Sequence, residues 1–304
     1  MAANVVETTG LTKHFGDVRA VQDLSLQVPR GTVFGLLGPN GAGKTTIIGT
    51  LLGLIRPTAG AIRLFGVQIN GSTDEAVRRI GAIMETPAFY PYLSGRDNLR
   101  YFQGIGGRDD AGEIDRLLGL VGLSDRAENR FNTYSLGMKH RLGLAYALLG
   151  DPELLLLDEP TNGLDPSGMA EVRQLLRELG DGERTVVLAS HLLNEVEQVC
   201  DRVAILSEGR VIAEGEVSAL IGRRDRLRLS TTDDGAARRV LGELEWVGSV
   251  LDVDGALLVE AAPERAGELS EALARVGVYP TELRGITTSL EQYFLEVTGE
   301  GEDA

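Results

Sequence analysis

The sequence lacks several features that would place it outside the reducing interior of a cell. Cys200 is the only cysteine among 304 residues, and one thiol cannot form an internal disulfide, which fits a reducing compartment. We expect this cysteine to be a small buried residue. No apolar run approaches the ~20 residues that span a bilayer, and the first ten residues, MAANVVETTG, lack the basic start and apolar stretch of a signal peptide. We therefore expect a cytoplasmic protein with no direct membrane insertion.

Basic charge is also scarce. Lys and Arg together number 30 against 45 Asp and Glu, which gives a net charge of −15. This balance argues against a nucleic-acid partner, because phosphate backbones are held by basic surfaces. It argues equally against direct adhesion to anionic lipid. Only Lys13, Lys44 and Lys139 are lysines. Any attachment to a membrane should run through a protein partner.

The order of apolar segments predicts a large α/β domain. Residues 1–30 alternate in places between apolar and polar and read as antiparallel β-strands. About residues 88–150 the pattern is mostly helical, which predicts a helical subdomain. Strands that alternate with helices imply a mainly parallel sheet covered on both faces. The buried strands expected in that sheet are residues 33–37, 154–157, 185–190 and 202–207.

A second, smaller domain is expected after residues 221–226. Residues 223–304 hold nine Lys+Arg and 17 Asp+Glu, a net of −8, so this segment carries more than half of the total charge. Its order of strand, helix, two strands, helix, strand and helix suggests an α+β split βαβ domain. The strands are expected at 226–230, 248–253, 256–260 and 280–284, and the helices at 235–243, 264–275 and 289–297. The predicted domains are therefore 1–222, 223–298 and a disordered tail at 299–304.

Two helices of this small domain carry apolar stripes that need packing partners. The stripes consist of Leu269, Leu273 and Val276 in one helix and of Leu290, Phe294 and Val297 in the other. Because the domain's own short sheet can cover only part of them, we expect it to pack on its own large domain or on a dimer mate.

A glycine-rich loop follows the strand at 33–37 and precedes a helical segment. It matches G-x-x-x-x-G-K-[ST] with Gly38, Pro39, Asn40, Gly41, Ala42, Gly43, Lys44 and Thr45. Glycines let the backbone curl so that N–H groups point at phosphate oxygens, and the helix N-terminus adds a favourable dipole. Lys44 is expected to bridge the β- and γ-phosphates, Thr45 to hold Mg²⁺, and Thr46 to join the nucleotide contacts. The plain alternative is a glycine-rich turn.

The strand LLLLDEP ends in two acids, Asp158 and Glu159. A buried strand delivers its C-terminal residues to the rim of the sheet, where the phosphate loop also lies. Asp158 can bind Mg²⁺ or its waters, and Glu159 can orient and deprotonate an attacking water. On its own, a strand that ends in two acids is weak evidence for a catalytic site, because solvated strand ends are common. After a phosphate loop it predicts an ATPase.

With these motifs in this order, residues 5–220 resemble the nucleotide-binding domain of ABC transporters, a phosphate-loop NTPase fold. Residues 134–138, YSLGM, are similar to the family's L-S-G-G-Q signature, and residues 162–165, NGLD, to its D-loop. The resemblance makes His191 the switch histidine and Phe15 the aromatic that stacks on adenine. Each has a plainer role as well: Ser135 can be an N-cap, Asp165 can shape a turn, and Phe15 can be core.

The resemblance implies a homodimer that closes head-to-tail on two ATP molecules with Mg²⁺. Each site would combine the phosphate loop, Asp158, Glu159 and His191 of one subunit with Ser135 and Gly137 of the other, and Asp165 is counted among the nucleotide-binding residues. Closing on ATP and opening after hydrolysis would drive a separate transmembrane permease, which would hold the subunit on the inner face of the cell membrane. The function implied is an ATP-hydrolysing exporter subunit for a drug, an antimicrobial peptide or a lipid-like substrate.

Two departures from the family pattern matter. The signature carries Leu136 where Gly is usual and Met138 where Gln is usual, but it keeps Ser135 and Gly137, so we expect function to survive. Glu85 stands where the Q-loop glutamine normally contacts Mg²⁺, and a carboxylate is a stronger metal ligand. We count Glu85 as a catalytic and metal residue. E-T-P-A with a following aromatic resembles the branch of bacitracin export, lantibiotic immunity and daunorubicin resistance, and residues 87–93, PAFYPYL, would then lie near the permease or pack as a core loop.

Three other functions compete with an exporter motor. Soluble ABC ATPases of translation or DNA repair usually carry two cassettes or a long coiled coil, and this chain has one cassette and no coiled coil. A kinase or another phosphate-loop enzyme would not carry the signature, the D-loop and His191 in order. An importer motor is disfavoured by the single short C-terminal domain and by the loop at Glu85.

Overall fold

The computed structural model describes residues 4–69, 75–84, 88–180, 184–221, 226–253, 255–286 and 289–298. The contacts divide the chain into two compact units, Met1–Gly215 and Glu216–Ala304, each with its own sheet and hydrophobic core. The domain boundary expected between residues 222 and 223 lies outside the described residues, as do Glu85 and the tail 299–304. Within the described ranges, no helix combines the length and the apolar character needed to cross a membrane.

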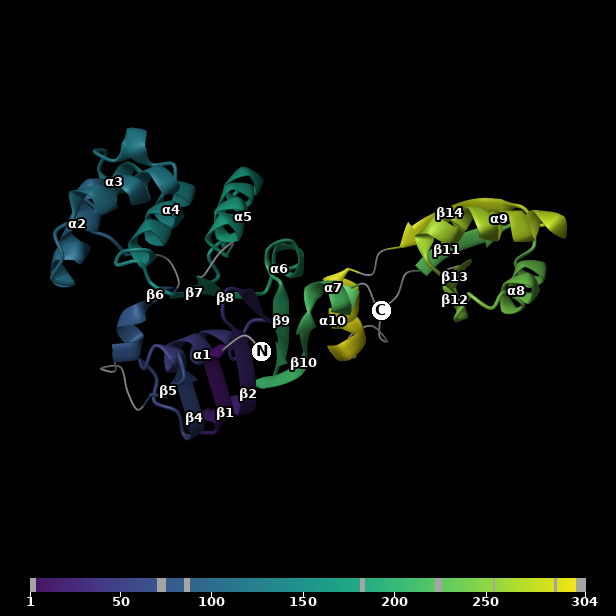
Figure 1. Ribbon diagram of the computed structural model, residues 1–304, viewed down its shortest axis with the longest axis horizontal. Coiled ribbons are helices and arrows are strands. Elements are labelled where there is room, and N and C mark those ends of the chain that lie inside the picture. Colours follow the sequence, from purple (N-terminus) through teal and green to yellow (C-terminus); the bar gives the residue numbers. More distant parts are fainter. Residues whose placement is uncertain are drawn as a thin grey trace. The chain divides into compact units, whose positions relative to one another are not determined.

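An antiparallel sheet of four strands, in the order β2-β1-β4-β5, opens the first unit (Figure 1). Its strands are β1 (Asn4–Phe15), β2 (Val18–Pro29), β4 (Ala59–Leu64) and β5 (Val67–Gln68). Every second residue of β2 from Leu24 to Val28 is buried, which is the period of two expected for a strand with one face on a core. The predicted antiparallel N-terminal subdomain is confirmed.

A six-stranded sheet in the order β10-β9-β3-β8-β7-β6 forms the centre of this unit. Strands β9, β3, β8, β7 and β6 pair in parallel, as predicted. The bounds are β3 (Val33–Leu37), β6 (Ile80–Ile83), β7 (Leu154–Asp158), β8 (Thr185–Ser190), β9 (Arg202–Ser207) and β10 (Arg210–Glu216). Every residue of β3, β7 and β8 is buried, because helices cover both faces of the sheet.

Helix α1 (Lys44–Leu51) lies on one face of this sheet, and α5 (Pro166–Gly180) and α6 (Leu193–Val199) lie on the other (Figure 1). Side chains alternate accordingly along β3. Phe34 and Leu36 join the core that includes α1, whereas a Cβ added at Gly35 would lie 2.8 Å from Val196 of α6. The glycine therefore lets α6 approach the sheet closely.

Helices α2 (Gly95–Ile105), α3 (Ala111–Leu120) and α4 (Leu136–Ala147) form the predicted helical subdomain between β6 and β7 (Figure 1). Short 3₁₀ turns lie at Glu75–Arg79, Ser124–Arg126 and Phe131–Thr133. Each of the three helices starts at a side chain that accepts a backbone N–H: Ser94, Asp110 and Ser135. Such caps satisfy donors that a helix start leaves open.

Residues 88–93 of the loop expected either to dock a permease or to pack as core include both packed and exposed aromatic side chains. Phe89 makes edge contacts with Phe102, Phe131 and Tyr146 at ring-centroid distances of 5.1–5.9 Å. Its neighbours Tyr90 and Tyr92 stay exposed, with Tyr92 at 77%. Aromatic packing at Phe89 therefore anchors this loop to the helical subdomain.

The second unit contains an antiparallel sheet in the order β12-β13-β11-β14 with helices α8 and α9 packed on it. Its elements are α7 (Val217–Ile221), β11 (Arg226–Thr231), α8 (Asp234–Gly242), β12 (Val250–Val253), β13 (Ala256–Glu260), a 3₁₀ turn at Pro263–Arg265, α9 (Ala266–Arg275), β14 (Pro280–Ile286) and α10 (Leu290–Thr298). The strands and helices from β11 onward follow the predicted order.

The predicted apolar stripes are only partly buried. Leu269 and Leu273 lie in the core of this unit, and Val276 is 57% exposed because α9 ends one residue earlier. In α10, Leu290 and Phe294 are buried, and Val297 is more exposed. Helix α10 packs against α7. Part of the α10 stripe therefore has its packing partner in α7, the helix that follows β10 in the chain.

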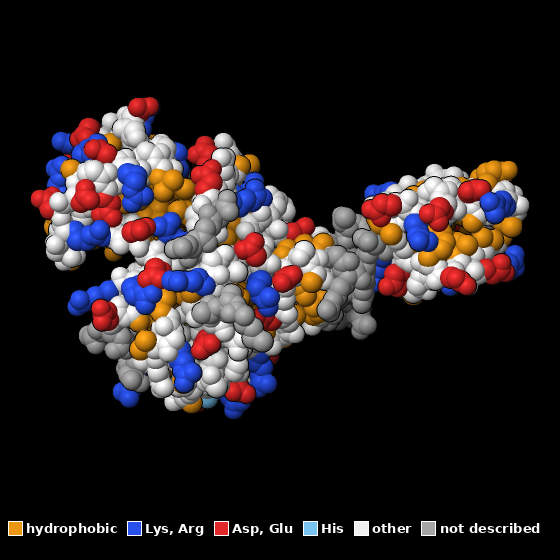
Figure 2. All heavy atoms as spheres, in the orientation of Figure 1, with side chains coloured by type: hydrophobic (Ala, Val, Ile, Leu, Met, Phe, Trp, Pro, Cys, Tyr) orange, Lys and Arg blue, Asp and Glu red, His pale blue; other side chains and the backbone are white. Residues whose placement is uncertain are grey.

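Charges of both signs are interspersed over the face of the molecule that Figure 2 presents. Lys and Arg side chains alternate there with Asp and Glu, and small apolar areas lie between them. Elsewhere in the described structure, charges of opposite sign form ion pairs, such as Arg96 with both Asp115 and Glu128. Basic side chains form no continuous stripe on this face.

Candidate active site

The phosphate loop connects the C-terminal end of β3 to the start of α1, as predicted. Gly41 and Gly43 have φ angles of 85° and 102°, in the left-handed region that favours glycine. A Cβ at Gly43 would lie 2.4 Å from the Ala20 carbonyl oxygen, and one at Gly38 would lie 2.4 Å from that of Leu206. Glycine is therefore required at both positions for close backbone approach.

Lys44 begins α1 and folds back over the loop. Its Nζ donates to the carbonyl oxygens of Gly38 at 2.7 Å and of Pro39 at 3.1 Å, and its side chain is only 6% exposed. The same ammonium lies 3.5 Å from Oε1 of Glu159. A lysine held this way presents a positive charge at the helix start, which is suited to a phosphate.

The two predicted acids lie at the end of β7, directly beside the loop. Thr45 Oγ1 donates to Oδ2 of Asp158 at 2.6 Å, which brings together two oxygen atoms of the kind that Mg²⁺ binds. Glu159 directly follows the strand, and its N–H donates to the Ala189 carbonyl oxygen at 2.9 Å. The parallel pairing of β7 with β8 thus holds both acids at the rim.

His191 follows the end of β8 and faces Glu159. Its Nδ1 lies 2.9 Å from Oε2 of Glu159. Each oxygen of this carboxylate therefore has its own partner, Lys44 on one side and His191 on the other, and the side chain remains 18% exposed. A carboxylate held in this way, within reach of solvent, can accept a proton from a water molecule.

A pocket of about 410 Å³ opens over these groups. Of the predicted nucleotide contacts, Phe15, Asn40, Gly41, Gly43, Lys44, Thr45 and Thr46 line it, together with Glu159. Gly38, Pro39 and Ala42 are not among its lining residues and support the loop instead; the Ala42 N–H, for example, donates to the Pro39 carbonyl oxygen at 3.2 Å. The volume falls within the range of small-ligand sites.

The sequence analysis missed several residues of this pocket: Val18, Arg19, Ala20, Gln22 and Glu208. Gln22 comes from β2 and Glu208 from the turn between β9 and β10, and they meet because the Gln22 side chain donates to the Glu208 carbonyl oxygen at 2.8 Å. Phe15 is 48% exposed at the rim, with Lys13 Nζ 4.6 Å from its ring centroid. The alternative that Phe15 is a core residue is therefore wrong, and its ring is accessible to the adenine base of a nucleotide.

The signature residues lie at the start of α4. Ser135 caps this helix by accepting the Met138 N–H at 3.3 Å, as predicted. Leu136, the departure from the family pattern, reaches toward the D-loop: a Cβ at Gly163 would lie 3.1 Å from Leu136 Cδ2. Among the described residues, no hydrogen bond joins Ser135 or Gly137 to the phosphate loop.

Asp165 caps the following helix. Its Oδ1 accepts the Gly168 N–H at 3.2 Å and its carbonyl oxygen accepts the Met169 N–H at 2.9 Å. This is the turn-shaping role considered from the sequence. Because Asp165 remains exposed, the cap leaves part of its side chain accessible to a partner.

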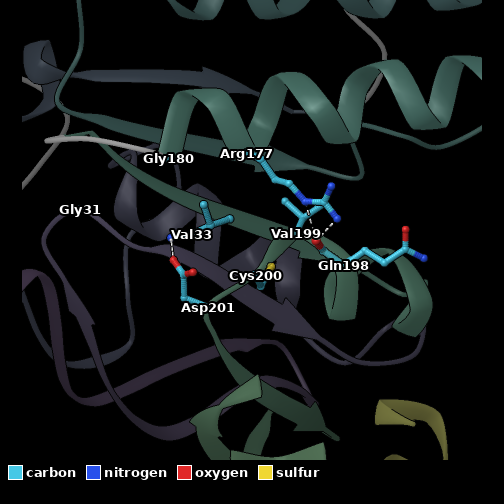
Figure 3. A pocket seen from close by; sticks show the side chains of 8 residues that line it. All are labelled: Gly31, Val33, Arg177, Gly180, Gln198, Val199, Cys200 and Asp201. Carbon is cyan, nitrogen blue, oxygen red and sulfur yellow. Dashed lines mark hydrogen bonds between the residues drawn. The ribbon is translucent and has the colours of Figure 1, made fainter. Parts of the chain in front are cut away.

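A second pocket, of about 560 Å³, lies at the opposite end of β3 and contains Cys200 (Figure 3). Its polar groups are already bonded: Asp201 Oδ2 accepts the Val33 N–H at 2.8 Å, and Arg177 donates to the Gln198 carbonyl oxygen. Cys200 is buried, as predicted, and burial raises the pKa of its thiol. This pocket therefore carries no chemistry like that at the phosphate loop.

Comparison with known proteins agrees with this geometry. The family described as ABC transporter matches residues 21–162. The bacitracin transport ATP-binding protein BcrA of Bacillus licheniformis is 40% identical over 303 residues, covering 98% of this chain and 99% of that protein. The daunorubicin resistance ATP-binding protein DrrA3 of Streptomyces coeruleorubidus is 37% identical over 308 residues, covering 99% and 98%. Both relatives match the two units together.

The first unit also has counterparts among solved structures. The ATP-binding cassette MJ0796, solved as a dimer in a post-hydrolysis state with ADP and Pi, superposes with a TM-score of 0.62. It is 25% identical, and the match covers 70% of this chain and 98% of that one. Nearly the whole of that cassette therefore has a structural counterpart in this chain.

Proposed function

The chain belongs to the ABC transporter family of ATP-binding proteins, and from this premise we propose that it is the ATP-hydrolysing subunit of an exporter. The observation that carries the proposal is the contact of Glu159 with both Lys44 and His191. Glu159 and Lys44 line one pocket, and the Thr45–Asp158 pair lies beside them. The relatives named for bacitracin transport and daunorubicin resistance support a drug or an antimicrobial peptide as the substrate.

ATP would bind along the pocket from Phe15 to the phosphate loop. The exposed Phe15 ring would stack on adenine, which contributes about 1–3 kcal/mol per base in stacked sites. The backbone of residues 38–46 would wrap the phosphates at the start of α1. Lys44, now held by two loop carbonyls and Glu159, would exchange these partners for phosphate oxygens.

The Thr45 and Asp158 side chains fit Mg²⁺. Their oxygens are hard donors of the kind that Mg²⁺ prefers, and the two side chains already meet in a hydrogen bond of 2.6 Å. Bound there, Mg²⁺ would neutralise charge on the phosphates. Glu85, outside the described residues, is proposed as a further ligand from its position in the Q-loop.

Glu159 would act as the general base. Its carboxylate would accept a proton from the water whose oxygen attacks the γ-phosphorus, while the bond from that phosphorus to the ADP oxygen breaks. His191 would hold the other carboxylate oxygen and contact the γ-phosphate. The His191 contact to Glu159 would remain after Lys44 turns to the phosphates, so one oxygen of the carboxylate would stay held.

The complete site would need a second copy of the chain. Ser135, Gly137 and Asp165 would contribute to the ATP bound by the partner, since the start of a helix such as α4 favours a phosphate. The relative solved as a dimer with ADP and Pi supports this arrangement. ATP bound across the interface would stabilise the closed dimer by mass action.

Transport would require a separate permease. The loop that contains the exposed Tyr90 and Tyr92 offers an aromatic surface for it, and this contact would hold the subunit on the inner face of the cell membrane. We propose residues 1–222 as the cassette and 223–298 as an accessory domain that steadies the dimer.

The exporter proposal can be tested in the host. A strain without the chain is complemented with the wild type or with Glu159→Gln, and growth is measured against a panel of peptide antibiotics and anthracyclines. Increased sensitivity that only the wild type restores is expected. Unchanged sensitivity together with a defect in translation or DNA repair would favour the soluble ATPase instead.

A further inference from the structure

The backbone at Glu159 is held in an unfavourable conformation. Its φ angle is 49°, in the left-handed region that non-glycine residues rarely occupy. The next residue is Pro160, whose ring further restricts the residue before it. Outliers of this kind cost of order 1–3 kcal/mol and persist only where surrounding contacts hold them. The proposed general base therefore depends on its neighbours for its direction.

Three backbone contacts hold this corner. The Glu159 N–H donates to the Ala189 carbonyl oxygen at 2.9 Å, and the Glu159 carbonyl oxygen accepts the Asn162 N–H at 3.1 Å. The third contact comes from a side chain 20 residues earlier: His140 Nδ1 lies 2.9 Å from the Pro160 carbonyl oxygen. A carbonyl only accepts, so Nδ1 carries the hydrogen in this bond.

His140 is placed for this contact. It is 5% exposed and lies on α4, the helix that starts at Ser135. On the same helix, Leu136 reaches the D-loop at Gly163. Two side chains of α4 thus meet the segment 160–163 that follows Glu159. The helix that presents the signature serine is thereby tied to the backbone that aims the base.

We propose that His140 is a positioning residue for catalysis, acting on Glu159 through the Pro160 carbonyl. The inference rests on the proposed role of Glu159. In a head-to-tail dimer, Ser135 would serve the partner's ATP and Glu159 the chain's own. Helix α4 would then link the two sites, so that a signature engaged on the partner's nucleotide favours the productive direction of Glu159.

The test compares two substitutions of the same shape. His140→Asn and His140→Leu leave similar space, but only the asparagine amide, which overlays Nδ1, can donate to Pro160. In the full-length chain, the Leu variant should lose about 10- to 100-fold in kcat, with the KM for ATP changed by less than about threefold. The Asn variant should recover about tenfold of that loss, because it restores the bond.

Thr8→Val is the matched control. Thr8 is buried in the antiparallel sheet, and its Oγ1 donates to the Leu24 carbonyl oxygen at 3.1 Å. Its removal should lower the melting temperature but leave kcat unchanged. Melting curves and kcat are measured for all three variants at a temperature where each is folded.

Equal kcat for the Asn and Leu variants would overturn the proposal, and so would a loss confined to KM. A loss of kcat in Thr8→Val equal to that in His140→Leu would overturn it too, since the effect would then follow stability alone. Glu159→Gln distinguishes the proposed role of Glu159 as general base from the proposed positioning role of His140. If that variant turns over normally, the function assigned to Glu159 fails; if it is inactive and His140→Leu is normal, only the positioning role fails.

Discussion

Replacing Glu159 with glutamine tests the proposed chemistry most directly. The two side chains have the same shape, so the strained backbone and the pocket should persist. Glutamine replaces one acceptor oxygen with an NH₂ group that only donates, so its oxygen can accept from Lys44, now at 3.5 Å, and its NH₂ can donate to His191 Nδ1, now at 2.9 Å, when that nitrogen is the acceptor. It cannot accept a proton from water. General-base transfer contributes about 10² to 10⁴-fold, or roughly 3–5 kcal/mol of the barrier, and kcat should fall by that factor.

The phosphate loop and the Thr45–Asp158 pair are untouched in this variant, so ATP affinity by calorimetry should stay within a few-fold of the wild type. With hydrolysis blocked, a dimer should accumulate in ATP and be seen by light scattering. Glu153→Gln is the matched control, because Glu153 lies beyond the other end of β7 and pairs with Arg30 and Arg79. That variant should keep wild-type turnover. Normal hydrolysis by Glu159→Gln, with ATP bound, would refute the reasoning.

Three other predictions follow from the site and from the chain's two units. Lys44→Ala removes the only cation of the phosphate loop and should weaken ATP binding at least tenfold, about 1.4 kcal/mol or more; calorimetry that finds unchanged affinity would argue against the loop assignment. Glu85→Gln should remain active, since an amide oxygen can still bind Mg²⁺ or water, whereas Glu85→Ala should lose export more than basal hydrolysis, and an equal loss of both would make it a chemical residue rather than a coupling one. Deletion of 223–304 removes α10, the partner of α7, and should leave basal ATP binding intact while weakening dimerisation or export. A truncated chain that dimerises and exports like the full one would remove the accessory role.

Local motifs explain how much could be predicted from the sequence. The glycines of the phosphate loop, the cap at Ser135 and the buried strand before Asp158 each depend on a few consecutive residues. Their backbone angles and nearest hydrogen bonds follow from residue type. The parallel sheet and the order of elements in the second unit were accessible for the same reason, since periodicity is a property of short segments.

The Q-loop interpretation remains a prediction, because Glu85 lies outside the described residues.

The apolar stripes that include Val276 and Val297 show that the helical period does not predict where a helix ends. Both residues fit a helical period, but α9 ends before Val276, and both remain more exposed than the other residues of their stripes. A helix end is set by local capping and packing, which periodicity does not encode.

The sequence by itself determined which chemical groups this protein brings to ATP: a lysine and a threonine on a phosphate loop, two acids at a strand end and a histidine after another strand. Only the tertiary structure decided their pairings. Lys44 and Glu159 are 115 positions apart and meet because β3, β8 and β7 are neighbours in the sheet. His140 reaches Pro160 because α4 packs on β6, the strand next to β7, a contact that no local pattern encodes. Strand order and helix packing arise from burial summed over the whole core, so the partner of each catalytic group depends on residues far from it in the chain.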